Sequence, residues 1–210
     1  MSAYELSLGA AYALKAAGVF AVIMIVAMSG RRTHHPYDRF GPANQITTVR
    51  ALLVALTAAL VGEPRGAGTA TAALAFGTFA LGLDGLDGWI ARRTRMTGAF
   101  GARFDMEVDA LLIQVLAILV WQHGKAGAWV LASGLWRYAF VAAGRLWPWL
   151  RRPLFASQRR RIVCAVQIAG LLLALLPAMQ PPVSSVVAAV SLAALSYSFV
   201  VDTVWLWRRR

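Results

Sequence analysis

Long apolar runs separated by short polar breaks dominate this chain of 210 residues. Six runs follow residue 43, and each approaches the roughly 20 residues that an α-helix needs to span a bilayer. They cover residues 43–61, 68–91, 101–121, 126–147, 162–176 and 183–207. The breaks carry residues that end helices, as in the segments GEPRGAG and PAMQPP. The pattern predicts an all-α protein, a polytopic membrane bundle of six transmembrane helices.

A further apolar run, residues 8–28, precedes these six and contains one charge, Lys15. A signal peptide has its positive charges before the apolar stretch, whereas two arginines follow this one. We therefore expect an additional helix, either inserted in the membrane or lying along its interface. Residues 1–42 would form this helix and a polar connector, and residues 43–210 a single six-helix domain.

Basic residues give the chain a formal net charge of +12, and their positions indicate a membrane protein. Thirteen arginines fall in alternate breaks and at the C-terminus, against two basic residues in the other breaks. The positive-inside rule therefore puts the arginine-rich side in the cytoplasm. The sequence has no zinc-finger, helix-turn-helix or RNP-like pattern, so we expect membrane lipids and no nucleic acid as partners. The expected location is a bacterial cytoplasmic membrane.

Five of the nine acidic residues lie within the 26 residues from Asp84 to Asp109. Asp84 and Asp87 are three residues apart, so they share one face of a helix. Asp105 and Asp109 are four apart and share a face of the next helix. If the two helices run antiparallel, all four carboxylates converge near the cytoplasmic end. Their mutual repulsion would be removed by one or two divalent cations, and an all-oxygen ligand set selects Mg²⁺, Mn²⁺ or Ca²⁺ over zinc.

Small residues accompany the aspartates on the same faces. Gly88 and Ala91 follow Asp84 by four and seven positions, and Gly101 precedes Asp105 by four. Glycine inside a helix costs about 1 kcal/mol relative to alanine, so these positions indicate close approach of a ligand. Paired metals held by aspartates suit phosphoryl transfer, and Arg92 at the helix end could meet a phosphate.

The complete pattern reads DxxDGxxAR, eight further residues, and GxxxDxxxD, from Asp84 to Asp109. It resembles the signature of the CDP-alcohol phosphotransferase (CDP-alcohol phosphatidyltransferase) family at every defined position. The six-helix plan and the cytoplasmic placement are also similar to that family, which extends the resemblance over residues 43–207. The N-terminal run lies outside it.

The resemblance implies a role for each residue of the pattern. Asp84, Asp87 and Asp105 would ligate two Mg²⁺ or Mn²⁺ ions, with Asp109 contacting one of them. Asp109 would also be the catalytic base that takes the proton of the acceptor hydroxyl. The pocket for the CDP group would be lined by Asp84, Gly88, Ala91, Arg92 and Gly101.

The resemblance also implies a reaction in phospholipid biosynthesis. An alcohol would attack the β-phosphorus of a CDP-linked lipid, CDP-diacylglycerol in our interpretation, and CMP would be released. Members of the family are commonly homodimers, so a homodimer is expected. Within the family, the alternative acceptor is a lipid alcohol that reacts with a CDP-linked head group. Outside it, the alternative is an ion channel or divalent-cation transporter with an acidic site in the membrane.

Several arginines outside the motif have two open interpretations each. Arg137 lies deep in the fourth run, where it either pairs with an aspartate or binds the acceptor. Arg145, Arg159 and Arg160 lie at the cytoplasmic mouth, as positive-inside anchors or as a pocket for a phosphorylated acceptor. Glu107 and Asp202 are expected to form salt bridges. The single cysteine, Cys164, is expected to be a small packing residue.

Overall fold

The computed structural model describes residues 9–34, 42–94, 99–152 and 157–209, and within these ranges it omits the side chains of residues 29–34, 42–43, 87–94 and 99. The described residues form α-helices and two short 3₁₀ helices, so the prediction of an all-α fold is confirmed. The elements are α1 (Ala10–His34), α2 (Pro42–Ala59), α3 (Ala67–Thr94), α4 (Ala99–Gln122), η1 (Ala128–Leu131), α5 (Ala132–Leu146), η2 (Pro148–Arg151), α6 (Gln158–Leu175) and α7 (Val183–Trp207).

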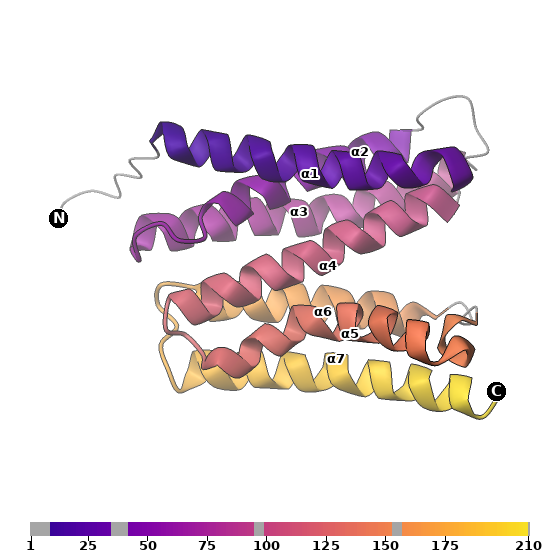
Figure 1. Ribbon diagram of the computed structural model, residues 1–210. Coiled ribbons are helices and arrows are strands. Elements are labelled where there is room, and N and C mark those ends of the chain that lie inside the picture. The colour runs from indigo at the N-terminus through magenta and orange to yellow at the C-terminus, as the bar shows by residue number, and fades with distance from the viewer. Residues whose placement is uncertain (1–8, 35–41, 95–98, 153–156, 210) are drawn as a thin grey trace.

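The helices run alongside one another in an elongated bundle (Figure 1). Helices α1, α2 and α3 form one side, α5, α6 and α7 the other, and α4 crosses between them. This central position explains the burial of α4, where Leu112, Leu116 and Leu119 are fully enclosed. The end of α3, the starts of α4 and α6 and the end of α7 all lie at the same end of the bundle, the right-hand end in Figure 1.

Two boundaries differ from the expected ones for physical reasons. The expected helix at 126–147 is instead the 3₁₀ turn η1 followed by a 15-residue α5. Helix α5 stops at Leu146 because Pro148 follows Trp147, and the residue before a proline is excluded from the helical region. Helix α6 begins earlier than expected, at Gln158, so the three arginines after it lie in its first turn.

The structure supports part of the predicted membrane topology. Three described helical segments are long and apolar enough to cross a bilayer: Ala10–Met28, Ala67–Leu86 and Val183–Trp207. The count of six spans is not confirmed, because α2 begins with polar residues and contains Arg50, α6 has three arginines in its first turn, and α4 carries several charged residues in its first three turns.

Helix α1 exposes the apolar face that a lipid environment would cover. Tyr12 and Ala16 are buried in the common core, while Leu14 and Ile25 are 76% and 68% exposed. The Tyr12 hydroxyl also donates a hydrogen bond to the carbonyl of Leu56 in α2, at 2.9 Å. Helix α1 therefore packs against the bundle along one stripe and leaves the rest of its apolar surface outside.

Lys125 joins two connections at the end of the bundle opposite the arginines. The side chain is buried, and Nζ donates to the carbonyl oxygens of Leu176 (3.3 Å) and Met179 (2.7 Å), just after α6. The carbonyl of Lys125 accepts hydrogen bonds from Ser184 (2.6 Å) and Ser185 (2.9 Å) at the start of α7. One residue thus ties the α4–η1 connection to the α6–α7 connection.

Replacing Lys125 with methionine is expected to lower the free energy of unfolding by about 2–3 kcal/mol, because two partly buried carbonyl oxygens lose a charged donor. Lys15→Met is the matched control, since the exposed Lys15–Glu63 pair should contribute under about 1 kcal/mol. Thermal unfolding in detergent measures the stability of both variants, and the exposure of Cys164 to a thiol reagent reports the unfolding. Equal effects of the two substitutions would contradict the role of Lys125.

Helix α5 approaches α4 closely at Gly134. A Cβ atom there would lie 2.7 Å from the backbone Cα of Gln114, which cannot move aside as a side chain can. Small residues at such crossings allow close backbone approach between membrane helices.

We expect Gly134→Ala to destabilise the protein by about 1–3 kcal/mol through overpacking. Gly18→Ala in α1 is the control, because a Cβ atom at Gly18 meets nothing within 4 Å. That substitution should be neutral or slightly stabilising, since alanine is the better helix former. The same unfolding assay tests the pair, and a Gly134→Ala protein as stable as Gly18→Ala would refute the close contact.

Candidate active site

Three carboxylates meet at the arginine-rich end of the bundle. Asp84 lies near the end of α3, and Asp105 and Asp109 lie in the first three turns of α4. One oxygen atom from each of these residues lies within 4.8 Å of the others. The expected convergence is therefore present for these three aspartates, which come from two helices packed in antiparallel directions (Figure 1).

The remaining residues of the α3 motif have no described side chains. Helix α3 continues through these positions to Thr94, so their backbone is helical as the spacing requires. The contacts of their side chains lie outside the described part of the chain. These residues are Asp87, Gly88, Ala91 and Arg92.

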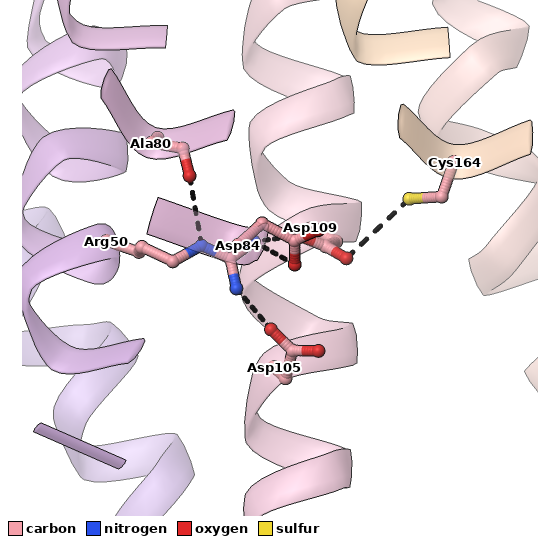
Figure 2. Close-up of polar contacts among 6 residues, drawn as sticks. All are labelled: Arg50, Ala80, Asp84, Asp105, Asp109 and Cys164. Carbon is pink, nitrogen blue, oxygen red and sulfur yellow. Dashed lines mark hydrogen bonds and ion pairs between the residues drawn. The ribbon is translucent and has the colours of Figure 1, made fainter. Parts of the chain in front are cut away.

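The centre of the site is an arginine that the sequence analysis overlooked (Figure 2). The side chain of Arg50, from the middle of α2, is 0% exposed, and Nε donates to the carbonyl oxygen of Ala80 at 3.2 Å. Nη1 pairs with Asp105, and Nη2 pairs with Asp109 and, at 3.1 Å, with Asp84. One guanidinium group thus contacts all three carboxylates.

A signal for Arg50 was available in the sequence. It is the one charged residue in the apolar run 43–61, and an ionisable residue inside a membrane helix marks a functional site by default. Its carboxylate partners could not be read from local spacing, because they lie at least 34 positions away along the chain. Only the packing of α2 against α3 and α4 brings them together.

Two further residues border the cluster. The thiol of Cys164 in α6 lies 3.6 Å from Oδ2 of Asp109, so Cys164 faces the site as well as packing between helices (Figure 2). Gly101 faces α2, where a Cβ atom would lie 2.8 Å from Oδ1 of Asn44. The missing side chain of Gly101 thus leaves room for a polar group of the neighbouring helix.

The donor set fits hard divalent cations. All the described candidate ligand atoms are carboxylate oxygens, the donors that Mg²⁺ and Mn²⁺ prefer. The side chains of Asp84 and Asp109 are each 16% exposed, and that of Asp105 is 28% exposed. The cluster is therefore partly shielded and still open to an ion and a substrate. Arg50 contributes a single positive charge against three carboxylates, which leaves negative charge for a cation to balance.

Arg137 lies away from this cluster. Its guanidinium pairs with Glu107 and contacts the sulfur of Met106 at 2.8 Å. The expectation that Glu107 forms a salt bridge is confirmed. Of the two open interpretations of Arg137, pairing with an aspartate is wrong, because α5 packs on the face of α4 that carries Glu107.

A basic group gathers around Asp202 of α7. Arg159 pairs with the buried Asp202 carboxylate and donates to the carbonyl of Ser198 at 3.2 Å. Nη1 of Arg160 lies 3.7 Å from the same carboxylate. The expected pairing of Asp202 with an arginine is therefore confirmed. Arg145 lies exposed in the last turn of α5.

Comparison with known proteins agrees with this geometry. The profile of the CDP-alcohol phosphatidyltransferase family matches residues 40–201. A Pseudomonas fluorescens protein named CDP-diacylglycerol–glycerol-3-phosphate 3-phosphatidyltransferase is 32% identical in an alignment 127 residues long, and the alignment covers 55% of this chain and 64% of that protein. The chain thus spans slightly under two thirds of the length of this relative. No solved structure matches this chain significantly. The profile covers most of the chain, including every residue of the aspartate motif, and the chain therefore belongs to the CDP-alcohol phosphatidyltransferase family.

Proposed function

We propose that this chain is an integral membrane enzyme of phospholipid biosynthesis that transfers a phosphatidyl group from CDP-diacylglycerol to a small polar alcohol and releases CMP. The observation that carries the proposal is the meeting of Asp84, Asp105 and Asp109 within 4.8 Å in a member of a phosphatidyltransferase family. Carboxylates so close together are costly unless a cation compensates them, and cation-assisted phosphoryl transfer uses that arrangement.

The lengths and the arrangement of the helices support a topology of six membrane spans. Helices α2, α4 and α6 run alongside the apolar α3 and α7, and α5 with η1 forms a comparable length. An 18-residue helix is about 27 Å long, close to the thickness of the hydrocarbon core. We therefore propose six spans plus α1, with the aspartate cluster at the cytoplasmic face, in a chain that forms a homodimer.

Asp84, Asp87, Asp105 and Asp109 would hold one or two Mg²⁺ or Mn²⁺ ions. When bound, such ions neutralise the pyrophosphate oxygens and the negative charge that develops on them during substitution. Gly88, Ala91 and Arg92 of α3 and Gly101 of α4 would accommodate the CDP group, as the family pattern implies.

Asp109 is the proposed general base. It would accept the proton of the acceptor hydroxyl, whose oxygen then attacks the phosphorus that bears the diacylglycerol. The new P–O bond joins phosphatidyl group and acceptor, the bond to the bridging oxygen of CMP breaks, and CMP leaves with that oxygen. The Asp109 side chain is 16% exposed, so its burial in this part of α4 restricts the access of water to the carboxylate.

The acceptor is proposed to carry a phosphate group. Arg159 and Arg160 contribute two positive charges against the single charge of Asp202, and the positive end of the α6 dipole adds to them. Arg145 could extend this basic surface, whereas Arg137 is engaged by Glu107 and is proposed as a structural residue. The name of the Pseudomonas relative includes glycerol 3-phosphate, which is a phosphorylated alcohol of this kind.

A panel of acceptors tests the proposal. The purified protein in detergent with Mg²⁺ and CDP-diacylglycerol is offered glycerol 3-phosphate, inositol phosphate, serine or glycerol, and a separate sample receives diacylglycerol with CDP-choline. We expect CMP release with a phosphorylated acceptor only, and a product mass equal to phosphatidyl group plus acceptor. Release only with unphosphorylated alcohols would contradict the acceptor class. No CMP with any acceptor would contradict the enzyme assignment.

A further inference from the structure

Arg50 occupies the atoms that a cation would be expected to use. The guanidinium reaches Asp84, Asp105 and Asp109 through the Oδ1 atom of each, and these residues also make up the candidate metal cluster (Figure 2). A divalent cation binds carboxylate oxygens at about 2.0–2.2 Å and repels a neighbouring positive charge. Arg50 and a cation therefore cannot both hold the three Oδ1 atoms.

The surroundings hold Arg50 against the three carboxylates. The side chain is fully enclosed, and its Nε is tied to the carbonyl of Ala80 in α3. A buried guanidinium without carboxylate partners would be strongly destabilising. The three clustered carboxylates would be equally destabilising without a positive charge beside them. Each group thus compensates the other within the bundle.

We propose that Arg50 is a positioning residue that acts as a displaceable counterion. Its guanidinium assembles the three carboxylates in the cation-free protein and withdraws from their Oδ1 atoms as divalent cations bind. This inference rests on the proposed metal-dependent function and adds a competition within that site. The cation affinity of the protein is then set partly by the cost of moving one arginine.

Direct measurement of Mn²⁺ binding tests this competition without turnover. Wild type, Arg50→Met and Arg50→Lys are titrated with Mn²⁺ in detergent, with free Mn²⁺ followed by electron paramagnetic resonance and no lipid substrate present. We expect Arg50→Met to bind Mn²⁺ at least about tenfold more tightly than wild type, because a competing charge is gone. Arg50→Lys keeps the charge and should remain close to wild type. Without cations, Arg50→Met should unfold at a lower temperature, and Mn²⁺ should raise its midpoint more than that of wild type.

Arg137→Met is the matched control. It removes an arginine that pairs with Glu107 on the same helix α4, away from the cluster, and should leave the Mn²⁺ affinity unchanged. Weaker or unchanged Mn²⁺ binding by Arg50→Met would overturn the competition, while leaving the proposed function intact. Absence of saturable Mn²⁺ binding by the wild type would overturn both.

A second measurement applies even if Arg50→Met does not fold. The arginine Nε–H signals of the wild-type protein are recorded by nuclear magnetic resonance during titration with Mg²⁺, and the Arg50 signal is identified by its absence from the Arg50→Lys spectrum. We expect this signal to shift in a saturable way as the guanidinium leaves the carboxylates. A signal that stays unchanged while Mg²⁺ saturates the site would overturn the proposal.

Discussion

Asp109→Asn is expected to lower CMP release by at least about 100-fold and to leave the protein folded. The amide keeps one oxygen that can accept the hydrogen bond from Arg50, so the packing around α4 should survive. It cannot take a proton from the acceptor hydroxyl at neutral pH, so the nucleophile is not generated. Initial rates of CMP release at saturating CDP-diacylglycerol, together with the unfolding midpoint, measure the two effects separately.

Glu107→Gln provides the control for Asp109→Asn. Glu107 lies two residues before Asp109 on α4 and pairs with Arg137 on the opposite face, outside the carboxylate cluster. The same charge change there should alter turnover only a few-fold. If Asp109→Asn retains turnover comparable to Glu107→Gln, Asp109 is not the base.

Removal of divalent cations is the second change with a large expected effect. Chelation followed by desalting should abolish CMP release, because the three clustered carboxylates would then face the pyrophosphate of the substrate without a divalent cation between them. Addition of Mg²⁺ or Mn²⁺ should restore the rate, while Zn²⁺ should not, since the described cluster offers oxygen ligands alone.

The chelated protein must remain folded for this result to be meaningful. Tryptophan fluorescence of the protein before and after chelation, and recovery of the full rate on adding Mg²⁺, serve as controls. Arg50 is expected to preserve the fold, because it compensates the carboxylates in the absence of cations. Undiminished CMP release by fully chelated protein would rule out the metal-dependent mechanism.

Helical periodicity explains why the acidic part of the site could be predicted. Spacings of three and four residues determine which side chains share a face, so the pairing of Asp105 with Asp109 required no tertiary information. The position of Asp84 beside them required only a short connection between two antiparallel helices. Local geometry was therefore sufficient for the convergence of Asp84, Asp105 and Asp109.

Contacts between distant helices could not be predicted in this way. Spacing shows that Glu107 faces away from the aspartates, but it does not say that α5 covers that face and supplies Arg137. The contacts of Arg50 depend equally on how α2 packs against its neighbours. Hydropathy also does not distinguish a 3₁₀ turn from an α-helix, which is why η1 was expected to be part of a longer helix.

Anomalous diffraction from crystals of the protein soaked with Mn²⁺ and CDP-diacylglycerol tests the central claim most directly. We predict one or two manganese peaks about 2.2 Å from the carboxylate oxygens of Asp84, Asp105 and Asp109, with a pyrophosphate oxygen as a shared ligand. Crystals that contain the nucleotide but show no manganese within about 5 Å of these oxygens would contradict the account.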